Sequence, residues 1–135
     1  MNFKFLEHTA DIKFQAFGKN LNEAFENSAL ATAKAMYSKK VNKKINKKIK
    51  IKGKDLPSLL YSFLEELIFL LDSSGFFLSS CKVKIDEKNF SLTAELFGDN
   101  AKNYGIGLDV KAITYNEMFV KKIKDKWVCQ VVLDV

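Results

Sequence analysis

Near Gly75 the hydrophobic pattern of the chain changes period, and this change constrains the fold more than any other feature. Before Gly75, two long segments repeat apolar residues every three or four positions, the spacing of a helix that buries one face. After it, apolar and polar residues alternate, as they do in strands that cover one side of a core. The sequence therefore predicts an α+β protein, in which two helices pack on one face of a mainly antiparallel or mixed β-sheet, in two layers.

Capping residues indicate where the two helices begin and end. Asn20 followed by Glu23 is typical of a capping box, so we expect the first helix to start there. Asp55 is expected to cap the second helix, and Pro57 is tolerated in its first turn. Gly75 then supplies the left-handed residue that ends this helix.

The remaining segments are expected to form strands, turns and one loop. Alternation predicts strands over residues 12–16 and 45–51 and in most of the chain after residue 76. Turn-forming residues are found at 86–89, 116–117 and 125–126. A polar loop is expected over residues 98–107, and its glycine pair lacks the strand-then-helix setting of a dinucleotide site.

Length and composition favour one domain over residues 1–135, because a chain of this size with 47% apolar residues can bury one core. Cys81 and Cys129 lack the spacing of a metal or redox pair, so we expect two buried, reduced thiols. No apolar run reaches the ~18 residues of a membrane span, and the first residues lack an apolar signal core. We therefore expect a cytoplasmic protein without a membrane partner.

The positive charge is concentrated in residues 39–54. This segment holds nine of the 22 lysines and no acidic residue, within a chain of formal net charge +6. Every basic residue is lysine, which disfavours sequence-specific base reading, since that relies on arginine. Two interpretations stay open: a solvated segment that protects a sheet edge, or a surface for RNA phosphates or an acidic partner.

Residues 7–11 and the last residues of the chain carry the candidate metal ligands. The first segment places two carboxylates beside His8, the only histidine, and Asp134 precedes the terminal carboxylate of Val135. If a sheet brings these ends together, Asp11, Asp134 and Val135 form an oxygen-rich pocket. Such a pocket suits a divalent cation of the Ca²⁺ or Mg²⁺ class.

Two further residues have both a functional and a structural interpretation. His8 could act as a general base near neutral pH, or it could be a packed histidine that supports a neighbouring ligand. Lys111 could serve a partner or phosphate, or it could be a strand lysine that faces solvent.

Several segments, taken in order along nearly the whole chain, resemble the archease family. They are residues 7–11 (EHTAD), 22–29 (NEAFENSA), 63–67 (FLEEL), 110–115 (VKAITY) and 131–135 (VVLDV). The resemblance implies a small α+β protein that is not an enzyme. It implies a cofactor of an RtcB-type tRNA ligase, one that promotes guanylylation of the ligase and its multiple turnover in tRNA splicing.

The resemblance also implies site residues. Metal would be bound by the acids at Asp11 and Asp134 together with Val135, and Lys111 would matter for activation, with His8 as a partner-binding residue. The chain departs from the family pattern at two places. A histidine often follows the Thr-Tyr pair, where this chain has Asn116, and another often occurs in the polar loop, where this chain has residues 103–104 (Asn-Tyr).

Two alternative functions remain compatible with the sequence. A metal-dependent phosphoesterase would use Asp11 and Asp134 on its own substrate. An RNA-binding or chaperone-like module would use residues 39–54, and RNA or a nucleotide could also be contacted within a ligase complex.

Overall fold

A computed structural model describes residues 1–8, 10–105 and 107–135 of the protein. Thr9, within the 7–11 motif, and Ile106, within the 98–107 loop, lie outside the described residues. The elements follow one another as β1 (Phe3–Leu6), β2 (Ile12–Gly18), α1 (Leu21–Met36), β3 (Ile45–Lys52), α2 (Leu56–Ser74), β4 (Phe76–Asp86), β5 (Ser91–Asn100), the 3-10 helix η1 (Ala101–Asn103), β6 (Ala112–Ile123) and β7 (Lys126–Asp134).

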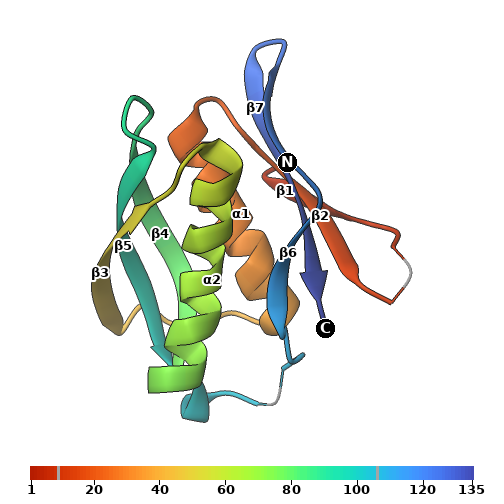
Figure 1. Cartoon of the computed structure of the whole chain (residues 1–135). Helices are drawn as coiled ribbons and strands as arrows, with labels where there is room; N and C mark the ends of the chain where they lie inside the picture. Colours follow the sequence, from red (N-terminus) through yellow and green to blue (C-terminus); the bar gives the residue numbers. More distant parts are fainter. Residues whose placement is uncertain (9, 106) are drawn as a thin grey trace.

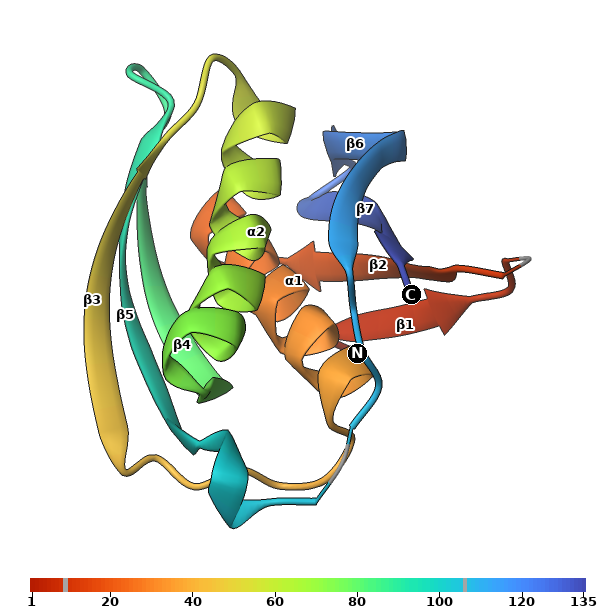
Figure 2. The ribbon, with the colours of Figure 1, turned by 60° about the horizontal axis from the view of Figure 1, so that its bottom comes forward.

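The strands form two antiparallel sheets, one on each side of the helix pair (Figures 1 and 2). Sheet A has the order β1-β2-β7-β6, and sheet B has the order β3-β5-β4. The predicted α+β class, with two helices packed on antiparallel strands, is confirmed. The structure adds that the strands divide into two sheets, so that the helices lie between them.

Both helices start at the predicted caps, and α2 also ends at the predicted glycine. The Asn20 side chain accepts a hydrogen bond from the Glu23 N–H at 2.9 Å, although the Glu23 carboxylate accepts from the Lys19 N–H and not from Asn20. Asp55 accepts from the Ser58 N–H at 2.8 Å, which caps α2. Gly75 ends α2 with a φ of 67°, in the left-handed region.

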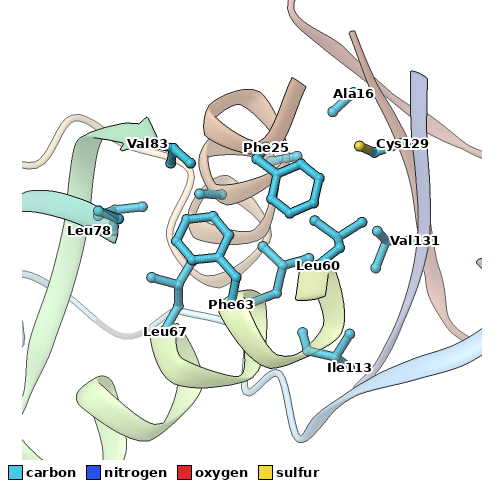
Figure 3. Close-up of a cluster of buried hydrophobic side chains, with 14 of the residues drawn as sticks. Ala16, Phe25, Leu60, Phe63, Leu67, Leu78, Val83, Ile113, Cys129 and Val131 are labelled. Carbon is cyan, nitrogen blue, oxygen red and sulfur yellow. The ribbon is translucent and has the colours of Figure 1, made fainter. Parts of the chain in front are cut away.

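The core lies between the helices and draws on both sheets (Figure 3). Phe25 of α1 and Phe63 of α2 are both fully buried, and their rings stack with centroids 6.2 Å apart. Val131 and Ile113 approach them from sheet A, and Val83 approaches from sheet B. The two sheets therefore keep their relative position through the helix pair that both contact.

The free edge of β4 is covered by side chains of α1. The Glu26 carboxylate accepts from the Val83 N–H at 2.8 Å, and Asn22 accepts from the Ile85 N–H at 2.9 Å. Burial raises the pKa of Glu26, and the Val83 hydrogen bond partly opposes this. Side chains that satisfy these backbone groups close the edge to further strands.

Two predicted breaks in the strand pattern are wrong. Residues 116–117 lie inside β6, where the register with β7 shifts between Thr114 and Phe119 and Glu117 has a φ of 55°. The bulge accommodates the polar residues without a chain reversal. Gly98 continues β5, and a Cβ there would overlap the carbonyl oxygen of Phe77.

Asp99 anchors the segment that follows β5. Its carboxylate accepts hydrogen bonds from the Tyr104 hydroxyl and the Asn100 N–H, both at 2.8 Å, and these bonds lower its pKa. The Tyr104 hydroxyl in turn accepts from the Asn42 N–H at 2.9 Å. This network joins the end of β5 to the lysine-rich segment before β3.

Within the described part of the chain, the helices are too short or too polar to cross a membrane.

Candidate functional site

The strand register of sheet A brings the first and last segments of the chain together. β7 lies between β2 and β6, with Ile12 opposite Leu133 on one side and Ala112 opposite Asp134 on the other. Continuing the β2–β7 register by one residue places Asp11 beside Asp134. The condition on which the predicted oxygen-rich pocket depended, that a sheet joins the two ends, is therefore met.

Lys111 and Val135 lie at the same end of the sheet. The Lys111 N–H donates to the Asp134 carbonyl oxygen at 2.8 Å, and Lys111 stands just before β6 and not within a strand. Lys111 and Asp134 are exposed. Val135 is partly buried against the core, which fixes its main chain at the end of β7.

His8 connects this end of the sheet to the bulge in β6. Its Nε2 lies 2.9 Å from Oε2 of Glu117, and its Nδ1 lies 3.4 Å from Oδ2 of Asp11. The other oxygen of Glu117 accepts from the Lys13 ammonium at 3.0 Å. Hydrogen bonds from His8 and then Lys13 lower the pKa of Glu117, so this carboxyl group is ionised and accepts both bonds.

The Nδ1 atom of His8 is buried and has no hydrogen-bond partner among the described residues. Because an ionised Glu117 can only accept, Nε2 carries a proton. Nδ1 faces the Asp11 carboxylate at 3.4 Å, and this contact is favourable when Nδ1 also carries a proton, as an ion pair, or when a cation lies between the two groups. A cation bound beside Asp11 is therefore one of two ways to satisfy this contact.

A surface hollow of about 820 Å³ opens next to His8 and Asp11. The end of β1 and the connection to β2 form one wall, and Lys34 and Ala35 of α1 form the other. The Lys34 ammonium is held by the carbonyl oxygens of Ser38 and Lys39. The site therefore has open space on one side, where a partner group or phosphate could approach the acids.

The donor set fits a hard divalent cation only in part. The described residues contain no group of three or more His, Cys, Asp and Glu side chains arranged to hold a metal. The candidate ligands are two carboxylates, Asp11 and Asp134, with the main-chain oxygens of Val135. Ca²⁺ or Mg²⁺ can complete such a set with water or partner oxygens, whereas a closed zinc site needs four protein ligands.

Both cysteines are free thiols, with Cys129 buried and Cys81 partly buried against the core. Burial raises the pKa of Cys81 and of Cys129 to about 12. At neutral pH both side chains are therefore protonated, and neither is an activated nucleophile.

Sequence reasoning did not find two residues of this cluster, Glu117 and Lys13. Glu117 was interpreted as a turn residue, because its polar neighbours suggest a turn. A signal was available: Glu117 interrupts an otherwise regular strand pattern in a chain with one histidine. The distance of 109 residues between His8 and Glu117 hides the pair from any local motif.

Residues 3–135 match the archease protein family. The chain belongs to the archease family. A curated archease of Sulfurisphaera tokodaii is 40% identical over an alignment 136 positions long, which covers 98% of this chain and 98% of the relative. An archease of Methanosarcina barkeri is 38% identical over an alignment 139 positions long, which covers 98% of this chain and 95% of the relative.

Two solved structures share the fold. A solution structure of a Methanobacterium thermoautotrophicum protein is 35% identical, has a TM-score of 0.85 and covers 99% of each chain. The crystal structure of a Thermotoga maritima archease, described as a possible chaperone, has a TM-score of 0.70 at 20% identity and covers 98% of this chain and 96% of that one. The family predicted from the sequence is thus confirmed.

Proposed function

We propose that this archease-family protein activates an RtcB-type tRNA-splicing RNA ligase. In this role it promotes guanylylation of the ligase and its multiple turnover, and it has no catalytic activity of its own. The observation that carries the proposal is the register of β2, β7 and β6. That register gathers Asp11, Asp134 and Lys111, the residues that the family resemblance singles out, at one exposed end of sheet A.

The acidic residues would hold the cation, and the neighbouring groups would orient them. Asp11 and Asp134 supply carboxylates, and Val135 supplies main-chain oxygens. His8, fixed by Glu117, keeps its Nδ1 directed at Asp11 and so limits the positions that this carboxylate can adopt. When bound, a divalent ion offsets negative charge on phosphate oxygens, the charge that builds during nucleotidyl transfer.

Lys111 would act on the partner and not on the cation. Its backbone is tied to Asp134, while its side chain is exposed. A lysine cannot ligate the ion in its ammonium form, so its charge is available for a phosphate or a partner carboxylate next to the acids.

The chemistry of the described residues supports an activator over an enzyme. Nucleophilic catalysis needs an activated hydroxyl or thiol beside a base, but both thiols have a pKa of about 12. In the described residues, His8 has carboxylates as its polar neighbours and no serine or cysteine. The phosphoesterase alternative rests on the open hollow beside Asp11. Hydrolysis of a simple phosphodiester by the isolated protein with Mg²⁺ would favour that alternative.

The test is a ligation reaction with a cognate RtcB-type ligase and a fluorescent RNA. Without the protein, the ligase should stop after about one turnover. Substoichiometric protein should restore repeated turnover and speed formation of the ligase–GMP adduct, because an activator is released and used again. Asp11→Ala should abolish both effects.

Lys111→Ala should weaken activation while leaving cation binding intact, and Lys122→Ala, a change of the same charge in the β6–β7 hairpin, should have no effect. Equal adduct formation with and without the wild-type protein would show that the activator assignment is wrong.

A further inference from the structure

The outer face of sheet B gathers lysines from two strands that are far apart in sequence. Across the sheet, one row joins Lys48, Glu95 and Lys82, and the next row joins Lys50, Thr93 and Lys84. These six side chains border a shallow hollow of about 700 Å³. No helix or strand of the described chain covers this side of the sheet, because both helices lie on the other side (Figure 2).

The positive charge of these lysines is largely uncompensated. Among the described residues, salt bridges form only around His8 and Lys13, so none involves the four lysines. Glu95 is the one acid bordering the hollow, and its carboxylate accepts a hydrogen bond from the Asn46 side chain at 2.7 Å. Lys82 also interacts with the Glu26 carboxylate at the β4 edge. The four lysines still outnumber these two acids, and such an excess of positive charge favours a polyanionic ligand.

Protection of the sheet edges accounts for the two lysines on β3 but not for the two on β4. Lysines on β3 discourage another strand from pairing with that open edge. The β4 edge is already closed by α1, since Glu26 and Asn22 accept hydrogen bonds from its backbone N–H groups. Lys82 and Lys84 are therefore not needed as edge guards, yet they mirror Lys48 and Lys50 across β5.

An aromatic ring lies on the same face as the lysines. Phe97 is two residues beyond Glu95 on β5, so its side chain is on the outer side, while that of Leu96 is fully buried on the inner side. Phe97 is half-buried and is not among the residues packed against the core. Its cross-strand neighbours are Asn46 and Ser80, one row beyond the lysine rows. A ring on a face that also carries cationic side chains can stack on a base, as in proteins that bind single strands.

We propose that the outer face of sheet B binds single-stranded nucleic acid without sequence specificity, with Lys48, Lys50, Lys82 and Lys84 contacting phosphates and Phe97 stacking on a base. Lysines at alternate strand positions are ~6.6–6.8 Å apart, a spacing comparable with that of successive phosphates in an extended strand. The absence of arginine agrees with binding that does not read sequence. This surface is separate from the acidic end of sheet A, and its binding requires neither cation nor ligase.

The test measures fluorescence anisotropy of a labelled 12-nucleotide oligouridine with the full-length protein in EDTA. Four phosphate contacts on a single strand predict a loss of affinity of about 50-fold between 50 and 200 mM salt. Replacing Lys48, Lys50, Lys82 and Lys84 together with Gln should remove most of this binding and its salt dependence. Circular dichroism and a thermal melt confirm that the variant is folded.

The matched control replaces four exposed lysines of the β6–β7 hairpin, Lys121, Lys122, Lys124 and Lys126, with Gln. This variant has the same net charge as the sheet B variant, so it should keep affinity within about twofold if the surface is specific. Equal losses in the two variants would overturn the proposal, because net charge alone would then explain binding. Glu95→Gln removes the acid that borders the hollow and leaves every lysine in place, so this variant should bind oligouridine severalfold more tightly. Weaker binding would contradict the proposal.

Phe97→Leu separates a nucleic-acid strand from other polyanions. It should weaken oligouridine binding about fivefold or more, the effect expected for loss of one stacked base. Binding of inorganic polyphosphate, which has no bases, should be unchanged. If Phe97→Leu has no effect on oligouridine, or if an acidic peptide competes as well as the oligonucleotide does, the surface recognises charge in general and the proposal is wrong.

Discussion

The imidazole of His8 and the carboxylate of Glu117 are 2.9 Å apart, and this contact links the β1–β2 connection to the bulge of β6. It predicts that His8 carries its proton on Nε2. Long-range ¹H–¹⁵N spectra should show this tautomer, and assignment is direct because the chain has one histidine. In Glu117→Ala the preference should be lost, whereas Glu95→Ala, on the other sheet, should leave the spectrum unchanged. An Nδ1-protonated ring in the wild type would contradict the prediction.

Cation binding should depend on both ends of the chain. Asp11→Ala and Asp134→Ala are each expected to weaken Ca²⁺ or Mg²⁺ binding about tenfold or more, because the affinity of a hard-cation site follows its ligand charge. Isothermal titration calorimetry provides the measurement. Asp125→Ala, in the turn between β6 and β7, removes the same charge away from the site and should bind normally. Wild-type affinity in both site variants would place the cation elsewhere.

The lysines before β3 are expected to matter little for ligase activation. Lys39, Lys40, Lys43 and Lys44 are exposed in an irregular segment, so their charge is solvated. Replacing all four with Gln should leave the rate of ligase–GMP formation within about twofold. A large loss in a folded variant would show that this segment steers RNA or the ligase, and the loss should then depend on salt.

The thiols should react slowly in the folded protein. Burial raises the pKa of Cys81 and Cys129 from 9.0 to about 12, which lowers the thiolate fraction at pH 8 about a thousandfold. Labelling with a disulfide reagent should therefore be slower by about this factor than in the denatured chain. Rapid stoichiometric labelling under native conditions would show that one of these side chains is accessible.

Glu26 should make stability depend on pH in a defined direction. Its pKa is raised in the folded state, so folding favours the protonated form, and its contribution to stability falls as pH rises from the unfolded pKa through the folded pKa. Glu26→Gln keeps an oxygen for the Val83 N–H and removes the charge. In denaturant unfolding, the free energy of unfolding of the variant should increase relative to that of the wild type as the pH rises from 4 to 7. A constant difference across that range would contradict the raised pKa.

Local signals in the sequence predicted the helices well. The caps at Asn20 and Asp55 and the left-handed Gly75 act within one turn, so the residues that decide each boundary are sequence neighbours. The strands were predicted less well. Alternation shows that one face is buried but does not show which strand is the neighbour, so the division into sheets A and B could not be derived.

The candidate site was predictable only in part, because it too depends on which strands are neighbours. The acids of residues 7–11 and Asp134 could be identified as candidate ligands at the two ends of the chain. Their proximity depends on β7 lying between β2 and β6. Glu117 interrupts the alternation of its strand, but its contact with His8 could not be derived, because it requires a bulge with a left-handed residue inside the strand. Lys82 and Lys84 looked like ordinary strand lysines until sheet B placed them opposite Lys48 and Lys50.

The central position of β7 in sheet A has a consequence for synthesis of the protein on the ribosome. Sheet B and both helices use only residues up to Asn100, so this half can assemble while the rest of the chain is still being made. Sheet A cannot join β2 to β6 until β7 emerges, and β7 carries Asp134 at its end. Asp11 and Asp134 are thus brought together in the same event that closes sheet A, and a chain that ends before β7 cannot form the proposed cation site.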